Sequence, residues 1–140
     1  MGLKLREIEL LTKDKQALSS FLSELLEMEV RPHQEQVLLE REDLTLVVTE
    51  VEGLRRQNSH MFVRFETDSV KELEHLASRW EFLNYRYQLS SQKKPGVRND
   101  GTWSSLQILD LDGRRWEFSC RSCLQLSPDR VKKLTSEHLN

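Results

Sequence analysis

The chain has 140 residues, a length that fits one compact domain with its own core. Its 21 basic and 23 acidic residues are mixed along the sequence, so the basic stripe that binds a phosphate backbone is absent and no nucleic acid partner is expected. No apolar run approaches the roughly 18 residues of a membrane span, and the charged N-terminus does not resemble a signal peptide. We therefore expect a cytoplasmic protein that does not enter the membrane.

Residues 3–11 predict the first strand. Apolar and charged side chains alternate there, which places Glu7 and Glu9 on one face and Ile8 and Leu10 on the other. This pattern is typical of a strand with one buried face, so Glu7 is expected on the face that points away from the core.

A helix and two or three strands complete the first half of the chain. Asp14 offers a helix N-cap, and apolar residues recur at helical spacing from there to Leu26. Strands are predicted over residues 36–41 and 44–51, with a short additional strand around residues 29–32.

The second half of the chain begins with another alternating segment, residues 60–65. His60, Phe62 and Arg64 share one face of this predicted strand, and the apolar residues between them share the other. If the apolar side packs on a helix, His60 and Arg64 face a cavity together.

A second helix and a further strand are predicted next. Ser69 begins a capping box, and an apolar stripe at helical spacing follows it. Residues 84–89 predict a strand that carries Tyr87, and residues 90–102 predict a long loop.

The segment DLDGRRWEF lies at the turn of a predicted hairpin, whose strands are residues 104–110 and 114–121. If Trp116 and Phe118 face the helices, Glu117 between them points into the cavity. A carboxylate in that position needs a partner, which is either a metal ion or an arginine.

The order strand, helix and two or three strands therefore occurs twice. The repeat predicts an α+β fold in which two βαβββ modules form a curved mixed sheet around a cavity, with the helices outside. We expect a single domain with module one over about residues 3–52, module two over about 59–122, and a helical tail over about 127–139.

Cys120 and Cys123 are the two cysteines, in C-x-x-C spacing. Half a zinc site, a redox pair and two incidental thiols are the alternatives. A zinc site would need two more ligands, and the sequence has no second C-x-x-C and no H-x-x-x-H.

Three stretches, residues 6–28, 59–73 and 108–118, resemble segments of the vicinal oxygen chelate superfamily. This superfamily includes glyoxalase I, fosfomycin-resistance thiol transferases, extradiol dioxygenases and bleomycin-resistance proteins. The third stretch, ILDLDGRRWEF, resembles the D-P-D-G-[NH]-x-[IL]-E-[FL] segment of these proteins. The resemblance implies a glyoxalase-like fold and, for a chain of this length, a homodimer.

The resemblance also implies a set of metal ligands. It places them at Glu7, His60 and Glu117, and the position of a fourth ligand falls on Val47, which cannot bind metal. Three such ligands suit a divalent ion (Mn, Mg, Ni, Zn or Fe) that acts as a Lewis acid on an oxygen-rich substrate. The implied activity is that of a lyase, isomerase or thiol transferase, with Glu117 as a catalytic residue.

A metal-free protein of the bleomycin-resistance type is the alternative. In that interpretation Glu117 pairs with Arg64, and the cavity binds a small-molecule ligand without chemistry. Arg64 and Arg115 could orient an anionic ligand in either case. The predicted ligand-binding residues are Arg64, Phe62, Gln107, Arg115 and Tyr87.

Overall fold

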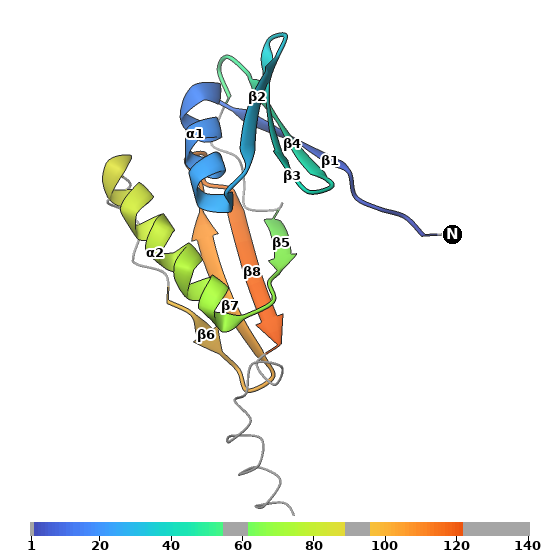
Figure 1. Ribbon diagram of the computed structural model, residues 1–140. Helices are drawn as coiled ribbons and strands as arrows, with labels where there is room; N and C mark the ends of the chain where they lie inside the picture. The colour runs from blue at the N-terminus through green and yellow to red at the C-terminus, as the bar shows by residue number, and fades with distance from the viewer. Residues whose placement is uncertain (1, 55–61, 89–95, 122–140) are drawn as a thin grey trace, which may run out of the picture.

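The computed structural model describes residues 2–54, 62–88 and 96–121, which form two βαβββ modules (Figure 1). The first module contains β1 (Glu7–Thr12), α1 (Lys15–Leu26), β2 (Glu29–His33), β3 (Gln36–Arg41) and β4 (Leu44–Glu50). The second contains β5 (Phe62–Glu66), α2 (Val70–Arg86), β6 (Arg98–Asn99), β7 (Trp103–Leu109) and β8 (Arg115–Arg121). The predicted helical tail lies outside the described residues.

The two modules have the same topology. The first sheet has the strand order β1-β4-β3-β2 and the second β5-β8-β7-β6. In each, the first strand pairs in parallel with the last, and the other pairs are antiparallel. This confirms the predicted α+β fold. Within one chain the sheets lie one above the other with both helices on the same side, and they do not close into one sheet (Figure 1).

The prediction of a strand over residues 84–89 is wrong, because α2 continues to Arg86 and Tyr87 is its C-cap. Trp80 and Leu83 are buried and continue the helical spacing that begins at Leu73, so packing against the sheet extends the helix. The second strand of this module is instead β6, within the segment that predicted a loop.

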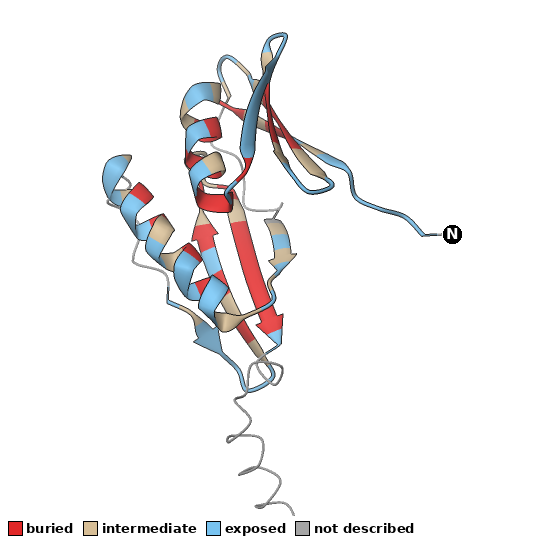
Figure 2. Cartoon of the chain, in the orientation of Figure 1, coloured by how far each residue is buried: buried red, intermediate tan, exposed pale blue. Residues whose placement is uncertain are grey.

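The core lies between the helices and one face of each sheet. Figure 2 shows buried residues along the inner sides of α1 and α2 and on the central strands. The largest fully buried side chains include Trp80, Trp116 and Phe21. Both predicted N-caps are confirmed: the Asp14 carboxylate accepts from the backbone N–H groups of Gln16 and Ala17, and the Ser69 hydroxyl accepts from Glu72 N–H.

The β7–β8 turn joins the two modules through buried charges. Arg114 donates to the Asp110 carboxylate at 2.7 Å and to the Leu11 carbonyl, at the end of β1, at 2.6 Å. Asp110 also accepts from Trp116 Nε1 at 2.9 Å, and its side chain is 0% exposed. The turn of the DLDGRRWEF segment therefore holds the second module against the first.

Candidate functional site

The candidate site is the face of the second sheet that points away from α2, called here the second open face. Trp116 and Phe118 belong to the core on the other side, so strand alternation places Glu117 on this face, as predicted. The charged and polar side chains of the second open face are Arg64, Glu66, Arg98, Ser105, Gln107, Arg115, Glu117, Ser119 and Arg121.

Glu117 is the most deeply placed carboxylate of this face. Only 8% of the surface of Glu117 is exposed. Arg64 donates to Glu117 Oε2 from Nε at 2.9 Å and from Nη2 at 2.8 Å. The two residues are register partners on the parallel strands β5 and β8. The pair that the sequence offered as the alternative to a metal ligand is therefore present.

Two other predicted residues surround this pair. Gln107 on β7 is the register partner of Glu117. Arg115 precedes Glu117 by two residues on β8, which places both side chains on one face about 7 Å apart along the strand. Arg64, Arg115 and Gln107 thus present one amide and two guanidinium groups around one carboxylate.

The two remaining predicted ligand-binding residues do not add to this group. Phe62 opens β5 as the register partner of Arg115, and its side chain lies outside the described part. Tyr87 lies on the helix side, where its ring packs edge-on against Phe21 with centroids 5.9 Å apart. The wrong strand at residues 84–89 explains this difference, since a strand would have turned Tyr87 toward the cavity.

Sequence reasoning missed two arginines of the second open face. Arg98 on β6 is the register partner of Ser105, and Arg121 lies 5.3 Å from the ring centroid of Trp103. Arg121 follows the same alternation along β8 as Arg115, Glu117 and Ser119, so the sequence pattern was sufficient to place it on this face. With four arginines and two glutamates, this face is basic.

The corresponding face of the first sheet, called the first open face, is acidic. Glu7 is exposed there, and Glu9 accepts from Gln36 Nε2 at 3.3 Å and from Thr49 Oγ1 at 3.0 Å. Glu40 forms an ion pair with Arg31 at 2.6 Å, and Glu29 is the register partner of Glu40. Val47 is buried at 6% exposure beside Glu9, in the position where a fourth metal ligand would be needed.

The predicted metal ligands do not meet in one place within the described residues of a chain. Glu7 lies on the first sheet and Glu117 on the second, and His60 lies outside the described residues. No group of three His, Cys, Asp or Glu side chains over residues 2–54, 62–88 and 96–121 could hold a metal ion. The Glu117 carboxylate also already binds a guanidinium that a cation would have to displace. The metal site stays a prediction.

Cys120 lies in the core, on the helix side of β8. Burial raises the pKa of its thiol, and a hydrogen bond with Thr67 opposes that effect. A buried protonated thiol is neither a good nucleophile nor a metal ligand. Cys123 lies outside the described residues.

Two βαβββ modules, each with an open sheet face, define a glyoxalase-like fold, and solved structures share this arrangement. The fosfomycin resistance protein FosX from Listeria monocytogenes is 19% identical, with a TM-score of 0.65 over 86% of this chain and 94% of that chain. FosX from Mesorhizobium loti is 14% identical, with a TM-score of 0.62 over 95% and 97%. A possible glyoxalase from Bacillus cereus is 11% identical, with a TM-score of 0.61 over 85% and 100%.

The chain thus shares the glyoxalase-like fold of these structures, the fold that its three sequence stretches implied. No protein-family model and no curated protein sequence matches it. In the described segments, none of the helices combines the length and the apolar character that crossing a membrane requires.

Proposed function

We propose that this protein binds a small anionic, oxygen-rich molecule on the second open face. The Arg64–Glu117 pair, flanked by Arg115 and Gln107, is the observation that carries the proposal. Guanidinium groups form paired, charge-assisted hydrogen bonds with carboxylate and phosphonate oxygens, so an anion is the ligand that this set favours.

Glu117 acts in this proposal as a positioning residue. Two hydrogen bonds to one carboxylate oxygen restrict the Arg64 guanidinium and leave its side chain 58% exposed toward the solvent. A restricted donor loses less conformational entropy when a ligand binds. Gln107 supplies an amide N–H to a ligand oxygen that Arg64 and Arg115 do not reach.

A homodimer is the second part of the proposal. The two open faces carry opposite net charge. In one chain, however, the buried Arg114 contact and the packing of α1 on α2 hold the sheets one above the other, with both helices on the same side, so the two open faces do not face each other (Figure 1). An acidic face of one copy against the basic face of another would enclose a cavity and reduce repulsion within each face.

A divalent-metal-dependent enzyme is the second candidate function. It is favoured by Glu117 itself, a nearly buried carboxylate at the middle of the open face, and by the resemblance that adds Glu7 and His60. The ion would supply Lewis acidity toward substrate oxygens. Because Glu7 and Glu117 lie on different sheets, such a site would combine the first sheet of one copy with the second sheet of another.

Ligand titration followed by Trp fluorescence tests the proposed anion binding, since Trp103 lies on the second open face. Small carboxylates and phosphonates are titrated into the wild type, Arg64→Gln, Arg115→Gln and the control Arg86→Gln, which changes an exposed arginine in the last turn of α2, outside both open faces. We expect the first two substitutions to weaken binding about tenfold or more, the loss of one charged hydrogen bond, and the control to leave it unchanged. Equal affinities in all four proteins would contradict the proposal.

Metal analysis decides between the candidates. Purified protein is dialysed against chelator, reloaded with each divalent ion and measured for bound metal, beside His60→Ala and Glu117→Gln. Stoichiometric metal that both substitutions remove would favour the enzyme. Anion binding that survives chelation supports the metal-free protein.

A further inference from the structure

We propose that the N-terminal arm of one copy, residues 2–6, docks into the acidic pocket between the two modules of a second copy. The pocket shares Glu66 with the second open face, and its other lining residues lie outside both open faces. The proposal goes beyond the homodimer suggested above, because it names a contact that ligand binding does not need.

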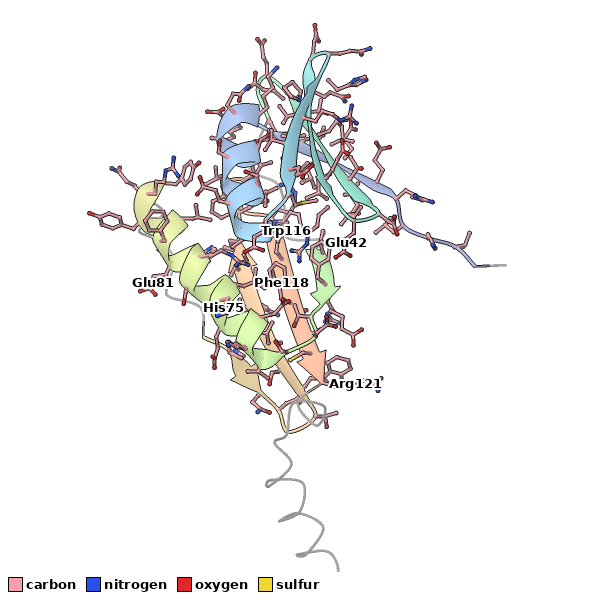
Figure 3. All side chains as sticks on the ribbon, viewed as in Figure 1. Glu42, His75, Glu81, Trp116, Phe118 and Arg121 are labelled. Atoms are coloured by element: carbon pink, nitrogen blue, oxygen red, sulfur yellow. The ribbon has the colours of Figure 1, made fainter. Side chains whose placement is uncertain are left out.

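The pocket is a cavity of about 540 Å³ where α1, α2, the β3–β4 turn, the C-terminal end of β5 and the middle of β8 meet. Its floor is apolar and includes Phe65 and Phe118, whose rings stack with centroids 5.7 Å apart. Figure 3 shows how three elements contribute to it, with Glu42 from the turn, Phe118 from β8 and His75 from α2. The remaining apolar lining residues are Leu26, Met28, Leu44 and Leu76.

The pocket carries a negative charge. Five carboxylates line it against the guanidiniums of Arg41 and Arg79, a net formal charge of −3 when His75 is neutral. Both guanidiniums bind the C-terminal end of α1: Arg41 donates to the Leu26 carbonyl at 2.8 Å and Arg79 to the Leu25 carbonyl at 3.1 Å. An occupant with an apolar body and positive charges matches this lining. The acidic residues are Glu27, Glu42, Glu66, Asp68 and Glu72.

The arm has those properties. Leu3 is 103% exposed and Leu5 is 67% exposed, and they alternate with the exposed cations Lys4 and Arg6. An extended segment with this alternation places two leucines on one side and two positive charges on the other. Two exposed leucines on one side of the arm form a small apolar surface that a partner can cover.

The geometry points to a second copy. The Arg6 carbonyl accepts from Thr45 N–H at 2.8 Å, so the arm is anchored where β1 begins. Beyond that anchor it runs away from its own body (Figure 1). The four residues beyond the anchor, residues 2–5, reach about 14 Å when extended.

An edge strand borders the pocket. β5 is the terminal strand of the second sheet, and two of its residues, Phe65 and Glu66, line the pocket. An edge strand presents backbone N–H and C=O groups that a further strand can pair with. The arm, already extended, could add to β5 while its leucines cover the Phe65 ring.

Disulfide crosslinking between two differently tagged chains tests this contact. One chain carries Leu3→Cys and the other Glu42→Cys, both with Cys123→Ser, and the matched control pairs Leu3→Cys with Glu81→Cys on the exposed side of α2. We expect mixed oxidised chains to form a crosslinked heterodimer well above the control, and the yield to fall in high salt as the charges are screened. Leu3→Ser/Leu5→Ser in the wild-type background should weaken self-association, measured by light scattering.

Three results would overturn the proposal. The first is a heterodimer yield no higher than that of the control pair, in a sample that light scattering shows to be dimeric. This result would exclude the arm contact but not the homodimer. The second comes from an additional variant that carries Leu3→Cys and Glu42→Cys in the same chain. If the disulfide forms only within that chain and never between chains, the arm fills its own pocket. The third is unchanged association after Leu3→Ser/Leu5→Ser.

Discussion

Replacing Arg114 with methionine tests the buried contact between the modules. The substitution keeps an unbranched side chain but removes the guanidinium that Asp110 and the Leu11 carbonyl bind. Both side chains of the pair are almost completely buried, at 2% and 0% exposure. Asp110 would keep its hydrogen bonds from Trp116 Nε1 and from backbone N–H groups, but it would hold a buried charge without a counter-charge.

Breaking a buried ion pair from one side costs about 3–5 kcal/mol. Since whole domains have unfolding free energies of about 5–15 kcal/mol, this loss is a large fraction of the total. Arg31→Met is the control, because the Arg31–Glu40 pair is exposed at 58% and 38% and such pairs contribute about 0–1 kcal/mol.

Urea unfolding of the wild type, Arg114→Met and Arg31→Met measures these free energies. A loss below about 1 kcal/mol for Arg114→Met would refute the reasoning. So would equal losses for Arg114→Met and Arg31→Met.

Three further predictions concern single residues. Arg64→Gln should destabilise the fold more than Arg31→Met, because it leaves the buried Glu117 carboxylate without the Arg64 guanidinium, but less than Arg114→Met, because the Arg64 side chain is 58% exposed; it should also weaken anion binding. A stability loss as large as that of Arg114→Met, with anion binding unchanged, would show that the pair is purely structural. Burial holds the pKa of the Cys120 thiol above its ordinary value, so the thiol stays protonated in the folded state where the unfolded chain releases its proton. Stability should therefore fall as pH rises through the ordinary thiol pKa, and Cys120→Ala should flatten that part of the profile measured by thermal unfolding. Asp14→Ala removes two N-cap hydrogen bonds of α1 and should cost about 1 kcal/mol in urea, whereas the exposed control Glu24→Ala on the same helix should cost less.

Local patterns predicted most elements and the position of Glu117. The alternation of Trp116, Glu117 and Phe118 is enough to place the carboxylate opposite the core, and Asp14 and Ser69 cap the helices as their sequence context indicates. The same reasoning failed at residues 84–89, where alternating tyrosines resemble a strand. There the burial of Trp80 and Leu83 against the sheet favours another helical turn, and that contact is not local.

The sequence by itself determined the repeated βαβββ order, the faces of the strands and the helix caps, because these depend on spacings of two to four residues. Only the tertiary structure decided that Glu117 holds Arg64, 53 positions away, and that Arg114 reaches the Leu11 carbonyl, 103 positions away. Contacts between residues so distant along the chain depend on how the two modules dock, and no local periodicity encodes that. The arrangement of the two sheets one above the other, and with it the separation of Glu7 from Glu117, follows from this docking. Sequence reasoning could therefore choose the candidate residues but could not bring them together.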